Sequence, residues 1–300
     1  MIDRRALLGM VLVCTAAGIG GLAVVMTRFV ISEMEPYTLA SVRYLIASLC
    51  LLGVVFAQGR RFRTDPSDRL VLILLALVFF AAFPFCFAAA LEHTTSARGA
   101  LIYACMPLLT GALAAFFRIE RLTSWKGIGV IFAILGVWSA IGLDVDAPEN
   151  ALQGDAIMVL ATAFTAIYTV FAKKYVMKYD GVAMTAWSML LGSGALFCVA
   201  VVLGEPFSGS LNFSVSGWAA FLFLAVPGGA FMMWCFIKGF QMVTPVQAAV
   251  SVGFNPLTTI FFGAWLVGEV ISTGSIIGFV LIVLAVLCAN KRNKFKPSSA

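Results

Sequence analysis

The chain has 300 residues, of which 62% are hydrophobic and 11% are charged, and its mean hydropathy is +1.02. A soluble domain of this size cannot bury so much apolar surface, so the composition excludes a soluble protein and predicts a polytopic membrane protein. The net charge of +6 does not indicate a nucleic-acid partner, because the basic residues lie between apolar runs rather than in one patch.

Apolar runs long enough to cross a bilayer, at roughly 20 residues each, follow one another along the whole chain. We expect ten spans, at residues 6–30, 37–57, 70–91, 95–117, 124–143, 152–172, 181–203, 215–239, 244–266 and 272–290. The first run resembles a signal peptide, but it continues without a polar break to about Phe29, which predicts an uncleaved span. The seven cysteines lie inside apolar runs without CxxC spacing, so we interpret them as buried apolar side chains.

A stretch with a central proline occurs twice in the sequence, 149 residues apart. The run 106–110, Met-Pro-Leu-Leu-Thr, returns at 255–259 as Asn-Pro-Leu-Thr-Thr, and Glu120 returns as Glu269. An internal repeat of this kind predicts two similar halves. We therefore divide the chain into a first repeat at 1–143, a second repeat at 144–290 and a basic tail at 291–300.

The charges predict how the spans are oriented. With the N-terminus placed inside and the spans alternating, 17 of the 20 basic residues fall on the inner side, whereas acidic residues dominate the outer loops. This bias places both termini in the cytoplasm. Five spans per half is an odd number, so the second half enters the membrane from the opposite side. The predicted fold is all-α, with ten transmembrane helices as two inverted five-helix repeats around a central cavity, a construction typical of secondary transporters.

The proline-containing helix and the loop led by a glutamate, Glu120-Arg121-Leu122-Thr123 followed by Gly127-Ile128-Gly129, resemble the EamA-type branch of the drug/metabolite transporter superfamily. The second half departs from this pattern at Gly268-Glu269-Val270, where the basic residue is missing. Ten-helix bacterial amino-acid exporters belong to this branch. The resemblance implies an export carrier of the bacterial inner membrane, with a cavity lined by spans 1, 3, 4, 6, 8 and 9 and with spans 5 and 10 at the periphery.

Two prolines are expected in the middle of their spans, where proline removes a backbone hydrogen bond and kinks the helix. Pro107 and Pro256 occupy equivalent positions in the two halves. This symmetry favours hinges over static kinks, and Gly253 would loosen the second one further.

Polar and aromatic residues inside the spans are candidates for the cavity wall, because polar groups in hydrocarbon need a partner helix or a wet cavity. The candidate substrate-binding residues are Thr15, His93, Tyr103, Thr165, Tyr168, Trp234, Gln247, Ser251 and Asn255. Threonine hydroxyls also bond to their own helix backbone, so the threonines are weaker candidates than the stripe at 247, 251 and 255. The single histidine, His93, is interpreted either as a loop residue or as a proton site.

Arg43 is a charge inside the second span. It either pairs with Glu33 or Glu35 and anchors the outer end of that span, or it attracts a substrate carboxylate. Apart from this alternative, the expected cavity lining of hydroxyls, amides and aromatic rings has no net charge at its centre, which predicts a small zwitterionic or amphipathic substrate.

No aspartate or glutamate is expected in the middle of a span, so transport is either facilitated or coupled through an outer group such as His93. We predict no catalytic residue, no metal and no cofactor. An integral membrane transferase is the alternative function, as is a broad facilitator of other specificity. The expected partners are a small-molecule substrate and the lipid bilayer, with the protein acting as a monomer or a weak homo-oligomer.

Overall fold

The computed structural model describes residues 4–59, 62–118, 124–142, 148–203, 213–242 and 254–290, and in these parts all regular elements are helices. The first half of the chain forms α1 (Arg4–Val30), α2 (Pro36–Ala57), η1 (Pro66–Asp68), α3 (Arg69–Leu77), η2 (Val78–Ala82), α4 (Phe83–His93), α5 (Ser96–Tyr103), α6 (Met106–Phe116) and α7 (Ser124–Gly142). The second half forms α8 (Ala151–Lys178), α9 (Gly181–Leu203), α10 (Val215–Ala225), η4 (Val226–Phe231), α11 (Met232–Phe240), α13 (Phe254–Phe262), η5 (Gly263–Val267) and α14 (Thr273–Asn290).

Seven helices in the described parts are long and apolar enough to cross a membrane. They coincide with the predicted spans 6–30, 37–57, 70–91, 95–117, 152–172, 181–203 and 215–239. The predicted spans 124–143, 244–266 and 272–290 coincide with shorter apolar helices within α7, α13 to η5, and α14. The structure therefore agrees with an all-helical, multi-pass membrane protein, whereas the count of ten spans stays a prediction.

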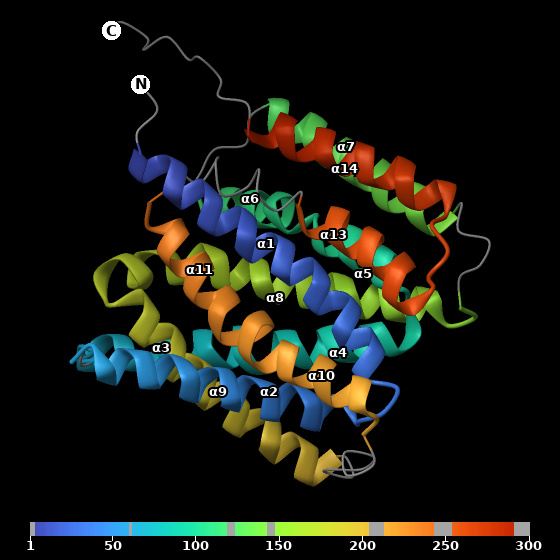
Figure 1. Cartoon of the computed structure of the whole chain (residues 1–300). Helices are drawn as coiled ribbons and strands as arrows, with labels where there is room; N and C mark the ends of the chain where they lie inside the picture. The colour runs from blue at the N-terminus through green and yellow to red at the C-terminus, as the bar shows by residue number, and fades with distance from the viewer. Residues whose placement is uncertain are drawn as a thin grey trace, which may run out of the picture.

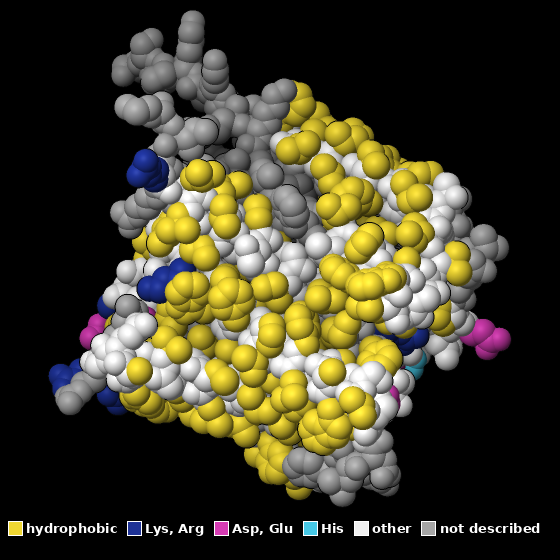
Figure 2. All heavy atoms as spheres, viewed as in Figure 1, with side chains coloured by type: hydrophobic (Ala, Val, Ile, Leu, Met, Phe, Trp, Pro, Cys, Tyr) yellow, Lys and Arg dark blue, Asp and Glu magenta, His cyan; other side chains and the backbone are white. Residues whose placement is uncertain are grey.

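The surface of the molecule carries a broad apolar belt. Figure 2 shows one face on which hydrophobic side chains cover the middle, while most charged side chains lie toward the left and right margins. Exposed large apolar residues such as Leu49, Leu74, Trp138 and Val202 are distributed over many helices. Such a surface would drive aggregation in water, but in a bilayer it faces lipid at little cost.

The helices run between two ends of the bundle, which we name after a charged residue at each. The Glu33 end is where α1 and α4 finish and α2, α5 and α8 begin, and there Arg28 Nη1 donates a hydrogen bond to the carbonyl oxygen of Leu91. The Lys178 end is where α8 finishes and α9 begins, and there Lys178 Nζ forms ion pairs with Asp65 and Asp68. The start of α1 and the end of α14 lie on the side of the molecule that holds the Lys178 end (Figure 1).

The two halves of the chain are interlocked. Helix α1 packs against α11 and α13 of the second half, and its counterpart α8 packs against α4 and α6 of the first half. Helices α7 and α14 pack along each other at one edge of the bundle (Figure 1), where the resemblance to the exporters places spans 5 and 10. On the opposite side, α2 packs against α9. Each of these four sets of contacts joins elements from different halves.

Two π-helical segments lie at the same place in the two halves, since their last residues, Ala82 of η2 and Phe231 of η4, are 149 residues apart. Helix α9 contacts η2 and helix α2 contacts η4. A π-helical turn locally widens a helix and is frequent at functional sites. Both segments lie within the third and eighth predicted spans, which border the cavity described below.

The fourth predicted span is broken rather than kinked. Helix α5 ends at Tyr103 and α6 begins at Met106, so the predicted mid-helix position of Pro107 is wrong: this proline lies in the first turn of a new helix. The first turn has unpaired N–H groups in any case, so proline removes no helical hydrogen bond there. Pro256 is buried and is the third residue of α13 as described from Phe254.

Candidate functional site

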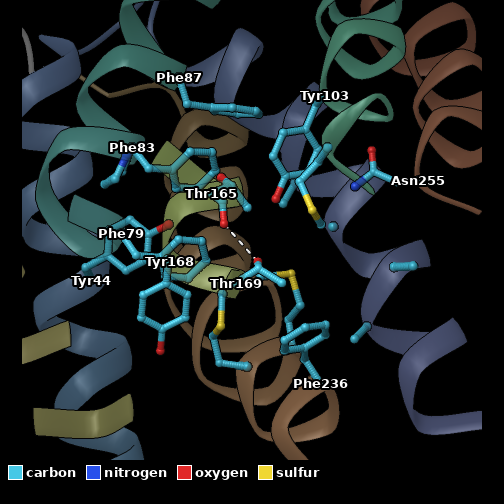
Figure 3. Close-up of a pocket in the computed structure, with 18 of the residues that line it drawn as sticks. Tyr44, Phe79, Phe83, Phe87, Tyr103, Thr165, Tyr168, Thr169, Phe236 and Asn255 are labelled. Carbon is cyan, nitrogen blue, oxygen red and sulfur yellow. Dashed lines mark hydrogen bonds between the residues drawn. The ribbon is translucent and has the colours of Figure 1, made fainter. Parts of the chain in front are cut away.

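A central cavity of about 190 Å³ lies between the two halves (Figure 3). Its lining comes from α1, α2, η2, α4, α5, α6, α8, α11 and α13. The resemblance to the exporters implied most of these helices, but it did not include the second span, and α2 contributes Leu39, Ala40, Arg43 and Tyr44. The cavity is therefore shared by both repeats and by one helix that sequence reasoning left out.

Aromatic rings form much of the cavity wall. The ring of Phe79 stacks on Tyr168 with centroids 4.3 Å apart and on Phe83 with centroids 5.3 Å apart. Tyr103 continues this row, with its ring centroid 5.7 Å from Phe83 and 6.0 Å from Phe87. Such a wall offers apolar contact to a ligand, and its ring faces also attract cationic groups.

Threonine hydroxyls on α8 also border the cavity. Thr165 Oγ1 donates to the carbonyl oxygen of Ala161 at 3.3 Å, and Thr169 Oγ1 donates to that of Thr165 at 2.8 Å (Figure 3). The hydroxyl hydrogens are thus used within the helix, as expected for threonine in a membrane span. What these residues offer to a ligand is the acceptor capacity of their oxygens.

Three buried polar atoms of the cavity lining have no hydrogen-bond partner within the described parts of the chain, namely Nε of Arg43, the hydroxyl of Tyr168 and Oδ1 of Asn255. Tyr168 and Asn255 are each only 8% exposed. A buried polar atom without a partner costs free energy, on the order of 1–3 kcal/mol. A bound ligand or water that satisfies these atoms is therefore favoured at this site.

Glycines of α1 bring Asn255 to the cavity wall. A side chain at Gly21 would overlap Thr258 Oγ1 and the carbonyl oxygen of Asn255, and Thr259 Oγ1 donates to the carbonyl oxygen of Gly21 at 3.0 Å. At the neighbouring Gly20, an added Cβ would lie 3.0 Å from Asn255 Nδ2. The close approach of α13 to α1 thus depends on these two small residues.

Arg43 does not pair with either glutamate considered from the sequence. Glu33 accepts hydrogen bonds from Ser214 at the start of α10, and Glu35 caps the first turn of α2. The side chain of Arg43 instead lines the cavity, as does that of Lys173 nearer the Lys178 end. The expectation of an uncharged lining is therefore wrong, because two cations belong to it.

Toward the Glu33 end, α5 and α8, which both line the cavity, are joined by a buried ion pair. The guanidinium of Arg98 on α5 pairs with the carboxylate of Asp155 on α8, and Thr94 Oγ1 donates to Asp155 Oδ1 at 2.8 Å. Arg98 is 2% exposed and Asp155 is 4% exposed. Next to them, Glu269 accepts hydrogen bonds from the N–H groups of Ser96 at 2.9 Å and Ala97 at 3.4 Å, at the start of α5. These contacts join the first half of the chain to the second.

Some of the predicted site residues meet at the cavity and others do not. Tyr103, Thr165, Tyr168 and Asn255 line it. Thr15 is exposed on α1 and is not part of the lining, so its prediction is not supported by the geometry. His93 is half-buried at the end of α4, and Trp234 stacks on Phe231 with centroids 6.2 Å apart, and neither residue belongs to the lining. The remaining candidates lie outside the described residues or side chains: Gln247, Ser251, Gly253 and the side chain of Pro107.

Sequence reasoning missed the row of Phe79, Phe83 and Phe87, because phenylalanine is common on every face of a membrane helix. Their spacing of four residues was the available signal, since it places them on one side of a helix. The Arg98–Asp155 pair was missed as well, because the two residues lie near the starts of the predicted spans 95–117 and 152–172, where a charge can reach water. A basic residue among small residues at the start of a span, in Ser96-Ala97-Arg98-Gly99-Ala100, was the signal for burial there.

Comparison with known proteins gives concordant matches along nearly the whole chain. The model of the EamA-like transporter family matches residues 7–142 and 152–291. YyaM, an uncharacterized transporter of Bacillus subtilis (strain 168), is 24% identical and covers 88% of this chain and 88% of its own. YetK, an uncharacterized transporter of the same strain, is 26% identical over 89% of this chain and 82% of its own.

More distant likenesses extend this result. A WAT1-related chloroplastic protein of Arabidopsis thaliana is 24% identical over 90% of this chain and 66% of its own. A solved crystal structure superposes with a TM-score of 0.67 over 95% of this chain and 94% of the other, at 16% identity, so the fold is shared. Since the family model matches both halves, the chain belongs to the EamA-like transporter family.

Proposed function

We propose that this membrane transporter exports amino acids or related small metabolites from the bacterial cytoplasm by alternating access. The observation that carries the proposal is the central cavity, which both halves line and which holds buried polar atoms without partners. Transporters hold their substrates near the membrane midplane at the interface of their two repeats. The direction, export, comes from the resemblance to ten-helix bacterial exporters.

The proposal includes ten spans arranged as two inverted halves, with both termini in the cytoplasm. It is supported by the reciprocal packing of α1 on α11 and of α8 on α4, and by the equivalent positions of η2 and η4. Helix α1 runs from the Lys178 end to the Glu33 end, whereas its counterpart α8 runs the other way. An axis in the membrane plane relates halves of this kind.

The arrangement of the cavity fits a state that is open toward the cytoplasm. Its lining reaches the exposed Lys173 and the half-buried Phe240 near the Lys178 end, which the charge bias places inside. At the Glu33 end, Arg98 and Asp155 are buried between α5 and α8. In this proposal a substrate enters from the cytoplasm, and opening of the Glu33 end then releases it outside.

The chemistry of the lining favours a small amphipathic substrate. Aromatic rings take up its apolar part, while Asn255 and Tyr168 satisfy its polar groups. In the described parts of the chain the lining contains no carboxylate that would carry a coupling proton. Transport is therefore facilitated, or it is coupled through a group outside the cavity such as His93.

Proteoliposomes that contain only this protein test the proposal. Vesicles loaded with single radiolabelled amino acids should release at least one of them faster than protein-free vesicles do. Asn255→Leu should abolish this release, whereas Thr185→Val, which changes a buried hydroxyl without a partner outside the cavity, should retain it. Release no faster than from protein-free vesicles across all the amino acids and a set of small metabolites would contradict the proposal.

A further inference from the structure

Arg43 places a positive charge in the wall of the cavity. We propose that its guanidinium, together with the neighbouring Thr27 and Tyr44, binds the carboxylate of the transported molecule. This inference deepens the proposed function and rests on it. The substrate class that it identifies is a small monocarboxylate with an apolar side chain, above all a zwitterionic amino acid.

The guanidinium is held in place by hydroxyls. Arg43 Nη1 donates to Thr27 Oγ1 at 3.0 Å, and Nη2 donates to Tyr44 OH at 3.1 Å. The guanidinium carbon lies 4.7 Å from the centroid of the Tyr44 ring. The Nε atom is buried and has no hydrogen-bond partner in the described residues. The guanidinium has five N–H groups, so it can bind these hydroxyls and still donate to a ligand. Its planar, forked arrangement of N–H groups matches the two oxygens of a carboxylate.

The charge of Arg43 is not balanced by an acidic side chain of the described residues. Glu33 bonds to Ser214, Glu35 caps α2, and Asp155 pairs with Arg98. The neutral hydroxyls of Thr27 and Tyr44 fill hydrogen-bonding positions, but they do not neutralise a cation. Arg43 lies about 10 Å along α2 from Pro36, at 1.5 Å per residue, well inside the span. An unbalanced charge at this depth is costly, and a substrate carboxylate removes that cost when it binds.

The rest of the cavity complements the other parts of an amino acid. Oδ1 of Asn255 and the hydroxyl of Tyr168 are buried acceptors without a donor in the described residues, which suits an ammonium group. Asn255 reaches the cavity from the opposite side to Tyr44 (Figure 3). The rings of Phe79, Phe83 and Phe87 provide the apolar surface for a side chain. Arg43, these neutral acceptors and the aromatic rings together match a ligand with one carboxylate, while Lys173, the other cation of the lining, lies nearer the Lys178 end.

A purely structural role for Arg43 makes a different prediction. If its bonds to Thr27 and Tyr44 only hold α2 against α1, replacing it weakens the binding of all ligands alike. If it binds a carboxylate, replacing it weakens only the ligands that have one. The ratio of affinities for an amino acid and for its amide therefore separates the two roles.

The experiment measures ligand binding to the purified full chain in lipid nanodiscs. The probes are L-phenylalanine, L-leucine and L-threonine, each compared with its carboxamide, which lacks the carboxylate and keeps the amine and the side chain. Wild-type protein should bind at least one of the acids about 10- to 100-fold more tightly than its amide, the range expected for charge-assisted hydrogen bonds. This comparison needs no variant, so it does not depend on whether substitutions fold.

Three variants then test whether Arg43 causes the tighter binding of the acid than of its carboxamide. Arg43→Gln should lose the preference for the acid while its affinity for the amide stays the same, because glutamine still donates to the neighbouring hydroxyls. Arg43→Lys should keep part of the preference, since it retains the charge and loses the fork. Arg69→Gln, at an exposed arginine at the start of α3, removes the same charge away from the cavity and should bind like the wild type.

Each outcome decides the inference. Equal binding of acids and amides by the wild type, or an undiminished preference in a folded Arg43→Gln, overturns it. A carboxylate preference that depends on Arg43, in a protein that moves no substrate in proteoliposomes, leaves the site standing and refutes the transport function. Transport of amino acids with no dependence on Arg43 leaves the proposed function standing and refutes the site.

Discussion

At the scale of single residues, the pair of Arg98 and Asp155 is a buried charged contact between the two halves. Besides Arg98, Thr94 donates a hydrogen bond to the Asp155 carboxylate. A buried pair of this kind contributes little over well-packed apolar residues, but removal of one partner leaves the other charge uncompensated. Loss of one partner should therefore lower the stability of the protein more than the intact pair raises it.

We expect Arg98→Met to destabilise the protein by about 3–5 kcal/mol, because the Asp155 carboxylate stays buried with a single hydroxyl donor. The double variant Arg98→Met/Asp155→Leu should recover most of this loss, since both charges are removed together. Thermal unfolding in detergent measures both. A double variant that is less stable than Arg98→Met would show that the ion pair itself, rather than the unpaired carboxylate, accounts for the effect.

At the scale of the helices, the breaks in the spans are concentrated around the cavity. The third and eighth predicted spans contain η2 and η4, and the fourth is divided between α5 and α6. Residues of these elements, including Phe79, Tyr103 and Met106, line the cavity. A helix that is already interrupted can bend without breaking further backbone hydrogen bonds, so these breaks are the places where we propose that the helices move.

The proline hinge is tested by replacing both residues with alanine. Alanine at 107 provides an N–H group that can bond to the carbonyl of Tyr103, so that α5 continues into α6 as one stiff helix. We expect Pro107→Ala/Pro256→Ala to insert and bind substrate but to transport slowly, as measured in proteoliposomes.

The control for this experiment is Pro36→Ala. Pro36 also lies in the first turn of a helix, but residues 31–35 before it form a turn rather than another helix. Transport by this variant should stay near the wild-type rate. A folded double variant of Pro107 and Pro256 that transports at that rate would leave the two prolines as packing features.

At the scale of the whole molecule, neither half is a self-contained unit. The first helix of each half packs mainly on elements of the other half, as α1 does on α11 and α13. The apolar belt then faces the membrane on the outside, while the cavity occupies the interface (Figures 2 and 3). In the proposed function, relative movement of the halves would change both ends of the cavity at once, as alternating access requires.

The predicted topology is tested by cysteine labelling in intact cells, after replacement of the seven native cysteines. Glu149→Cys at the Glu33 end should react with a membrane-impermeant maleimide added outside, and Arg63→Cys at the Lys178 end should react only after the membrane is opened. Both positions are exposed in the structure. Labelling of both from the same side would refute the inverted arrangement and the cytoplasmic placement of the termini.

The sequence by itself determined where most of the helices lie along the chain. Hydrophobic runs and the charges between them are local properties, and they placed boundaries such as 181–203 at the same residues as α9. The repeat of Pro107 and Pro256 and the glutamate-led loop that follows the first of them also pointed to a transporter family that the comparisons then showed. For the site, Tyr103, Thr165, Tyr168 and Asn255 could be predicted, because polar side chains inside a span need an interior position.

Only the tertiary structure decided which faces of the helices meet. In a bilayer the lipid-facing side and the cavity-facing side of a helix are both apolar, so hydropathy does not indicate its rotation about its own axis. For this reason Thr15 was placed in the cavity although it is exposed, and the Phe79 row was missed although it forms the wall. The partner of Arg98, Asp155, comes from a helix 57 residues further along the chain, and the partner of Arg43, Thr27, comes from the adjacent helix α1. Contacts of that kind follow from packing in three dimensions, and no local pattern specifies them.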